Sequence, residues 1–133
     1  MTPIFADTVG LLALWDMSDQ WHEAAERAFE EFSKDRRPII TTSLVLFECG
    51  NAAARRPYRA EVSRVREVLE RTGLLVAPSQ ADLIAAWDNY AKTHVGGAGI
   101  VDMVSFEVMR RLGLSDAFTN DRHFVEAGFN VLF

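Results

Sequence analysis

The chain is poor in the residues that build disulfides and sites for soft metals. It has one cysteine, Cys49, and three histidines, which lie far apart in the sequence. An internal disulfide is therefore excluded, and no spacing typical of a zinc site is present. Any metal that the protein binds is expected to have oxygen ligands.

Long apolar runs are also missing. None reaches the roughly 20 residues that a membrane-spanning helix needs, and no basic segment followed by an apolar one stands at the N-terminus. These absences predict a cytoplasmic protein with no membrane partner. The chain has 133 residues, of which 49% are hydrophobic and 25% charged. This balance predicts one globular domain, residues 1–133, with a single core.

Positive charge is scarce, and almost all of it is arginine. The net charge is −5, which argues mildly against bulk attraction to nucleic acid, although local patches matter more than totals. The only lysines are Lys34 and Lys92. Half of the arginines gather in one segment, where glutamates are interleaved with them: Arg55, Arg56, Arg59, Arg64, Arg66 and Arg71. A solvated helix face with ion pairs and a patch that binds phosphate or a partner both explain this segment.

Short apolar runs alternate with helical patterns along the chain, which is typical of β–α units. Strands are predicted at 4–7, 38–42, 74–77, 117–120 and 130–133. Helices are predicted at 10–17, 21–34, 44–56, 58–72, 78–94, 100–112 and 123–127, with Ser43 as the cap of the third. Crossovers made of helices favour a parallel sheet covered on both faces, a three-layer α/β/α sandwich.

Four carboxylates stand where the pattern would favour apolar residues: Asp7, Glu48, Asp102 and Asp121. Glu48 is expected to share a helix face with buried residues, where an ionised carboxylate costs several kcal/mol unless it is compensated. Each acid also has a simpler explanation. Asp7 and Asp121 can cap helices, and Glu48 can pair with an arginine. Asp102 stands near the start of a helix, where the helix dipole favours a negative charge.

The predicted topology nevertheless brings the four acids together. In open parallel sheets, binding sites form outside the carboxyl ends of the strands, where the strand order reverses. Asp7 and Asp121 both follow strands, and Glu48 and Asp102 lie on helices that can pack beside that edge. Carboxylates held close together repel one another, and Mg²⁺ or Mn²⁺ relieves this repulsion because these cations prefer oxygen ligands.

Four segments resemble the acidic motifs of PIN-domain proteins, in order and in spacing. They are "ADT" (6–8), "SLVLFECGNAAARR" (43–56), "VDMVSFEVMRRLG" (101–113) and "AFTNDRHFVEAGF" (117–129). The resemblance covers nearly the whole chain and is strongest to VapC-type toxin ribonucleases of type II toxin–antitoxin systems. It implies a five-stranded parallel sheet between helices and RNA cleavage that depends on Mg²⁺ or Mn²⁺.

Carried over by position, the resemblance implies an acidic quartet of Asp7, Glu48, Asp102 and Asp121, with Ser105 as a polar partner one turn after the third acid. We expect Asp7 and Asp102 to bind a cation directly. Glu48 and Asp121 would bind it through water or hold a second ion. One departure is Gly99, where many relatives carry a serine that can cap the helix of Asp102.

The residues around the quartet admit other roles. Arg122 can contact phosphate, whereas packing or capping is the preferred interpretation of His123, and Cys49 is expected to be a small buried hydrophobe. Two alternatives to the toxin remain at this stage. One is a housekeeping or noncatalytic PIN domain in RNA processing. The other is a phosphoacceptor signalling domain, which is weakened because no lysine follows the late strands.

The resemblance also implies partners. A toxin of this class is silenced by a cognate antitoxin and tends to form homodimers or toxin–antitoxin hetero-oligomers. Trp15, Met17 and Trp21 are close in sequence to Asp7 and are expected to offer a groove for an amphipathic helix, although closing the core explains them almost as well. An arginine from the antitoxin can also satisfy the acids in place of a metal.

Overall fold

A computed structural model describes residues 1–133 and contains five strands and seven helices. The strands are β1 Ile4–Ala6, β2 Ile39–Thr42, β3 Leu75–Val76, β4 Asp116–Phe118 and β5 Asn130–Val131. The helices are α1 Thr8–Trp15, α2 His22–Lys34, α3 Ser43–Ala53, α4 Arg59–Thr72, α5 Gln80–Lys92, α6 Ile100–Leu112 and α7 Arg122–Glu126. No helix has the length and apolar character that a crossing of the bilayer demands.

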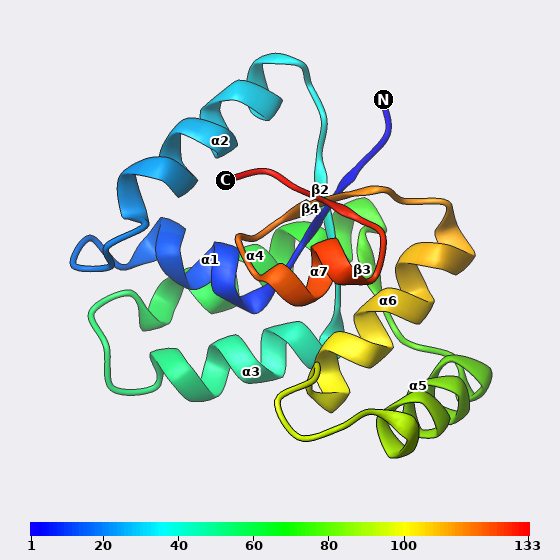
Figure 1. Cartoon of the computed structure of the whole chain (residues 1–133). Coiled ribbons are helices and arrows are strands. Elements are labelled where there is room, and N and C mark those ends of the chain that lie inside the picture. The colour runs from blue at the N-terminus through cyan, green and yellow to red at the C-terminus, as the bar shows by residue number, and fades with distance from the viewer.

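All five strands pair in parallel in the order β3-β2-β1-β4-β5, and helices lie on both sides of the sheet, so the predicted sandwich is confirmed (Figure 1). From β1 the chain first builds outward through β2 to β3. It then returns to the other side of β1 with β4 and β5. The strand order therefore reverses between β1 and β4, which is where sheets of this kind open a crevice at their carboxyl ends.

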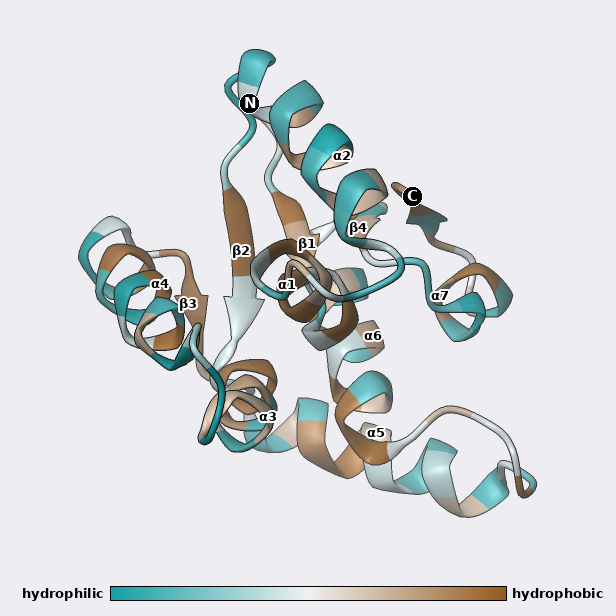
Figure 2. Cartoon of the chain, turned by 90° about the vertical axis from the view of Figure 1, so that its left-hand side faces the viewer, coloured by the Kyte–Doolittle hydropathy of each residue, from teal (hydrophilic) through white to brown (hydrophobic).

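The core lies on both faces of the two central strands. Ile4, Phe5 and Ala6 of β1 are fully buried, as are Ala117 and Phe118 of β4. Figure 2 shows β1 and β2 as apolar strands in the middle of the molecule, while α2 turns its hydrophilic side outward. Burial on both faces explains why these strands read as continuous apolar runs rather than as alternating ones.

Several element boundaries differ from those predicted. The helix predicted at 10–17 begins at Thr8, immediately after Asp7, because Gly10 allows close packing: a Cβ there would lie 2.0 Å from the Phe118 carbonyl oxygen. The predicted cap of α3 was wrong. Thr42, not Ser43, caps that helix, since its hydroxyl accepts a hydrogen bond from the Val45 N–H at 3.2 Å.

Candidate active site at the carboxyl edge of the sheet

Asp7 lies at the end of β1 and is 1% exposed. It stands at the N-cap position of α1, yet its side chain caps nothing there. Instead, Oδ2 accepts a hydrogen bond from the Thr119 hydroxyl at 3.0 Å, at the end of β4. Burial, followed by the charge of Asp102, raises the pKa of Asp7 to about 7. The carboxylate is therefore held in place without a cationic partner, which is costly for a structural residue.

Asp102 comes from the first turn of α6 and is partly buried. Burial raises its pKa to about 6, and the charges of Asp121 and Glu48 add to this effect. A hydrogen bond from the Gly99 backbone acts in the opposite direction. Gly99 is the N-cap of α6 and provides no side-chain cap. The backbone of Gly99 thus favours the charged form of Asp102 without a side-chain cap.

Asp121 caps α7 and also faces the same site. Its Oδ1 accepts a hydrogen bond from the His123 N–H at 2.9 Å, and the His123 ring nitrogen Nδ1 lies 3.0 Å from the same oxygen. The other ring nitrogen, Nε2, lies 3.0 Å from the Gly96 carbonyl oxygen. Both neighbours of the ring are acceptors, so the protonated form is favoured and the pKa of His123 is raised, first by the Gly96 contact. His123 is thus a counter-charge to Asp121.

Glu48 does not lie where the pattern placed it. It was predicted to share a face with buried residues, but it is exposed. The prediction was wrong because Ala52, one turn further along α3, is exposed as well, so this face opens to solvent. Glu48 is oriented across the site by Thr8, whose hydroxyl donates a hydrogen bond of 2.6 Å to Oε1.

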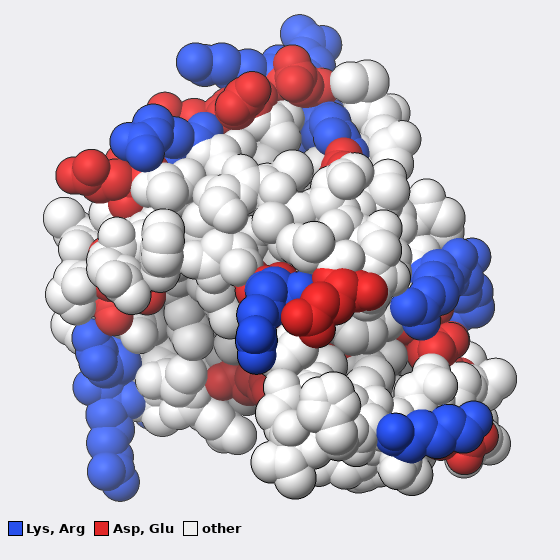
Figure 3. Space-filling model, in the orientation of Figure 1, with Lys and Arg blue, Asp and Glu red and all other residues white.

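The four carboxylates line one open hollow of about 650 Å³, together with Thr8, Val9, Asn51 and Ala52. In Figure 3, acidic and basic side chains reach the surface side by side near the centre of the face, over α7. Oxygen atoms of Asp102 and Asp121 and a ring nitrogen of His123 lie within 4.8 Å of one another. Asp7 and Glu48 line the same hollow as Asp102 and Asp121.

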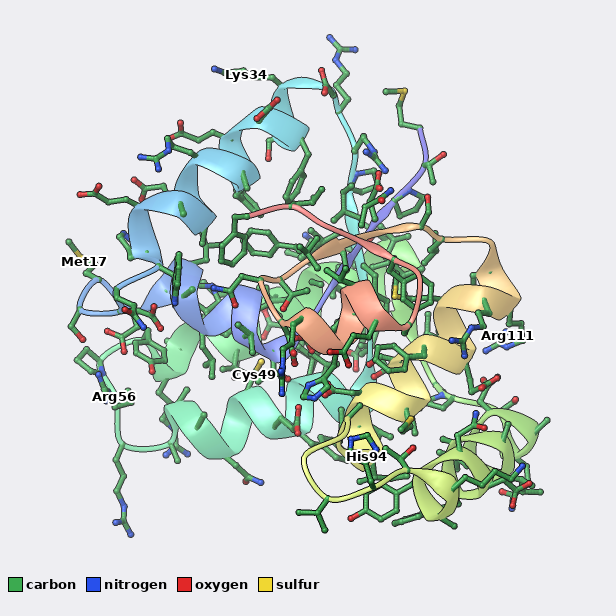
Figure 4. All side chains as sticks on the ribbon, in the orientation of Figure 1. Met17, Lys34, Cys49, Arg56, His94 and Arg111 are labelled. Carbon is green, nitrogen blue, oxygen red and sulfur yellow. The ribbon has the colours of Figure 1, made fainter.

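Ser105 and Cys49 lie near the acids in the sequence, but both are buried and neither lines the hollow. The Ser105 hydroxyl, one turn after Asp102 on α6, is buried and has no hydrogen-bond partner. Cys49, next to Glu48, lies in the interior between α1 and α3 (Figure 4), and burial raises the pKa of its thiol to about 12. Cys49 is therefore neutral and unreactive at physiological pH.

The residues that orient the acids were not found from the sequence. Thr8 and Thr119 hold Glu48 and Asp7 through hydrogen bonds that join residues far apart in the chain. The one available signal was that Thr8 and Thr119 each adjoin a strand end that carries an acid. His123 was noticed only as a capping or packing residue, yet its side chain contacts Asp121.

Comparison with known proteins agrees with this architecture. The PIN domain family model matches residues 4–130. The chain is 30% identical over 136 aligned positions to the 23S rRNA-specific endonuclease VapC20 of two Mycobacterium tuberculosis strains, covering 95% of both chains.

Solved structures match over a similar extent. The crystal structure of Mycobacterium tuberculosis VapC20, a sarcin–ricin loop cleaving toxin, superposes with a TM-score of 0.75 at 26% identity and 95% coverage of both chains. The crystal structure of FitAcB from Neisseria gonorrhoeae gives a TM-score of 0.66 at 17% identity, covering 98% of this chain and 96% of that one, and shares the fold. On the family model and the 30% identity, this chain belongs to the PIN-domain family.

Proposed function

We propose that the protein is an endoribonuclease that hydrolyses RNA phosphodiester bonds with the help of Mg²⁺ or Mn²⁺, and that it is the toxin of a type II toxin–antitoxin pair. The observation that carries this proposal is the shared hollow of Asp7, Glu48, Asp102 and Asp121. No arginine or lysine lines that hollow, so the protein itself leaves much of its negative charge uncompensated.

The donor set fits a hard divalent cation. The available ligands are carboxylate oxygens, which Mg²⁺ and Mn²⁺ prefer, and the His123 nitrogens both face acceptors already. Oxygen atoms of Asp102 and Asp121 lie within 4.8 Å of each other, and Asp7 and Glu48 line the same hollow. The Ser105 hydroxyl is buried and unpaired but does not line the hollow, so it is not counted among the ligands of the cation.

A divalent cation held by these residues would lower the pKa of a bound water and would neutralise charge on the phosphate oxygens. The residues of the chain supply the geometry. Thr119 fixes the carboxylate of Asp7, Thr8 fixes that of Glu48, and the α7 N-terminus fixes that of Asp121. Arg122, exposed beside Asp121, is assigned to the RNA backbone.

Ribosomal RNA is the substrate that similarity favours, because the relative at 30% identity is named a 23S rRNA-specific endonuclease. We place the activity in the cytoplasm, where such RNA is found. The carboxylates in the hollow would exclude RNA without a cation, since phosphate and carboxylate repel each other.

A cognate antitoxin is the proposed partner. A hollow of about 680 Å³ lies where the end of α1 meets the α3–α4 connection, and it is lined by Trp15, Met17 and Tyr58 among others. Met17 is 85% exposed, and Trp15 packs on Tyr58 at 6.5 Å between ring centroids. Trp21 does not line this hollow, although it is 47% exposed. The groove suits an amphipathic helix that carries an arginine to the acids.

Mapping new RNA 5′ ends after induction in cells tests this proposal. We expect cuts confined to a few positions in one class of RNA. We also expect growth arrest, and co-expression of the protein encoded by the neighbouring gene should relieve it. Cells that tolerate the protein alone, with cuts at processing sites only, would favour a housekeeping nuclease. If no new 5′ ends appear, the result would favour a noncatalytic PIN domain.

A further inference from the structure

A second hollow adjoins the acidic one. It has a volume of about 510 Å³ and lies between α3 and α4, with Leu75 of β3 among its lining residues. Asn51 lines both hollows. Phe47 and Gly50 of α3 face the second hollow, whereas Glu48 faces the acidic one, so α3 presents adjacent sides to the two. Figure 2 shows α3, α4 and β3 together at one edge of the molecule.

Two features of α3 are unfavourable if the helix serves only to pack against the rest of the fold. Phe47 is 69% exposed, although it directly precedes Glu48 of the acid quartet. Gly50 lies inside the helix, where glycine costs about 0.5–1 kcal/mol relative to alanine. A Cβ at Gly50 would meet nothing within 4 Å, so no contact inside the protein requires glycine there. The absent side chain keeps the helix backbone open beside the Phe47 ring.

We infer that this second hollow is a subsite for an unpaired nucleobase of the RNA, next to the phosphate held at the acids. This inference rests on the proposed function, because RNA is what brings a base and a phosphate to adjoining hollows. The base stacks on Phe47 over the open backbone of Gly50. The Asn51 side chain, at the junction, offers hydrogen bonds to the base edge.

The chemistry of the lining favours a base over a protein helix. Leu46 and Val62 give apolar walls, while Ser63 and Arg66 place polar groups at the margin. A nucleobase has the same character, with apolar faces and a polar edge. Unpaired RNA is commonly read by stacking its bases on aromatic side chains, whereas a helix partner needs a longer apolar stripe. Arg66 is exposed and its Nε donates a hydrogen bond of 3.0 Å to Glu70, which also lines the hollow, so its terminal nitrogens are the groups left for the adjoining backbone phosphate.

The test measures RNA binding without cleavage. A short fluorescein-labelled single-stranded RNA of mixed sequence is titrated with the full chain in Ca²⁺ in place of Mg²⁺, so that the acids have a cation with oxygen preference. Anisotropy gives the Kd, and a gel checks that the RNA stays intact. A blunt duplex that contains the same strand is titrated in parallel. The variants are Phe47→Ala, Phe47→Trp and Gly50→Leu. The last places a side chain over the backbone that glycine leaves open. Trp87→Ala is the control, because Trp87 is an aromatic of similar exposure (55%) on α5, outside both hollows.

We expect Phe47→Ala and Gly50→Leu each to weaken single-strand binding by roughly 5- to 100-fold. Phe47→Trp and Trp87→Ala should stay within about threefold of the unmodified chain, and duplex binding should change little. Single-strand binding that survives both Phe47→Ala and Gly50→Leu would overturn the subsite, as would an equal loss for the duplex. A loss of self-association or antitoxin binding in their place would make the surface a protein interface and would also overturn it.

The outcome is separable from that of the proposed function. If the protein cleaves no RNA but its RNA binding depends on Phe47, the proposed nuclease activity is contradicted and the proposed subsite is supported. Cleavage that is unaffected by Phe47→Ala, with unchanged binding, would keep the nuclease and remove the subsite.

Discussion

Asp7 is the most constrained residue of the site. It is fully enclosed, accepts a hydrogen bond from Thr119, and has other carboxylates rather than arginines beside it. Stability alone does not account for such a residue, because an unpaired buried carboxylate destabilises the fold. The protein keeps Asp7 charged only where something binds to it, or where the pH is high enough to remove its proton.

The pH dependence of the metal-free protein follows from Asp7 and Asp102. The pKa of Asp7 is raised from an ordinary 3.8 to about 7, and that of Asp102 from 3.8 to about 6. Between pH 3.8 and about 7, the folded state therefore binds more protons than the unfolded state. Their contribution to stability is full below pH 3.8 and is lost as the pH rises to about 7. In EDTA, we predict that the free energy of unfolding falls by on the order of a few kcal/mol across this window.

Urea unfolding at a series of pH values measures this slope. Asp7→Asn should flatten most of it, since the amide does not titrate. Asp19→Asn should not, because Asp19 is a partly exposed residue of the α1–α2 connection and asparagine keeps the oxygen that accepts from the Trp21 N–H. A metal-free protein whose stability rises between pH 5 and 7 would show that the acids are compensated by other groups.

Glu48 gives a second prediction at this scale. Because Glu48 is exposed and Gln keeps an oxygen for the Thr8 hydroxyl, Glu48→Gln should change metal-free stability by less than about 1 kcal/mol. The sign should be stabilising, since the charge of Glu48 raises the pKa of Asp102. RNA cleavage should fall by roughly 100-fold or more. Chemical denaturation and a gel cleavage assay decide both points, and a large loss of stability would indicate an ion pair that the structure does not contain.

At the scale of elements, the packing of α1 against β4 aligns Asp7 with Thr119. Gly10 makes this possible, because an added Cβ would lie 2.0 Å from the Phe118 carbonyl oxygen. Gly10→Ala should therefore destabilise the fold by roughly 2 kcal/mol or more and should lower activity.

Gly50→Ala is the matched control, since it changes the same residue type inside another helix. Open space surrounds that position, so alanine should stabilise the fold by up to about 1 kcal/mol. Thermal unfolding of the two variants gives the comparison. Equal effects would mean that α1 does not pack on β4 as described.

Local patterns predicted the elements well where signals were strong. The helix at 100–112 has the predicted bounds, because an apolar face and Gly113, in a left-handed conformation, define it. Boundaries failed where long-range packing decides, as at Gly10 in α1. The four acids could be predicted because carboxylates at strand ends are conspicuous. The orientation of their side chains could not be predicted. The hydrogen bond from Thr119 to Asp7, for example, joins residues 112 positions apart in the sequence and forms only in the folded protein.

At the scale of the whole molecule, three hollows occupy neighbouring places. The acidic hollow shares Asn51 with the α3–α4 hollow, and the Trp15–Met17 groove lies beyond the far end of α1. Figure 4 shows Met17 and Arg56 on that side of the molecule, and Figure 3 shows basic side chains gathered there. RNA and antitoxin are thus assigned to opposite ends of α1, and an antitoxin arginine that reaches the acids would exclude the RNA.

The groove makes a separate prediction. Met17→Glu should weaken the complex with the antitoxin by roughly 10-fold or more, because Met17 is exposed and lines the groove. The free protein should keep its melting temperature and its nuclease activity. Val95→Glu, at a fully exposed residue of the α5–α6 connection, is the control. Calorimetric titration of the co-expressed partner measures the difference, and equal affinities of the two variants would place the antitoxin elsewhere.

The central claim is that Asp7, Glu48, Asp102 and Asp121 act together on RNA through a divalent cation. The most direct measurement is cleavage of purified ribosomal RNA by the purified chain, with and without Mg²⁺ or Mn²⁺, beside Asp7→Asn and a control, Asp16→Asn, whose carboxylate lies in the other groove. We predict discrete products only with a cation, a loss of roughly 100-fold or more for Asp7→Asn, and unchanged products for Asp16→Asn. The same products in EDTA, or from Asp7→Asn, would contradict the claim.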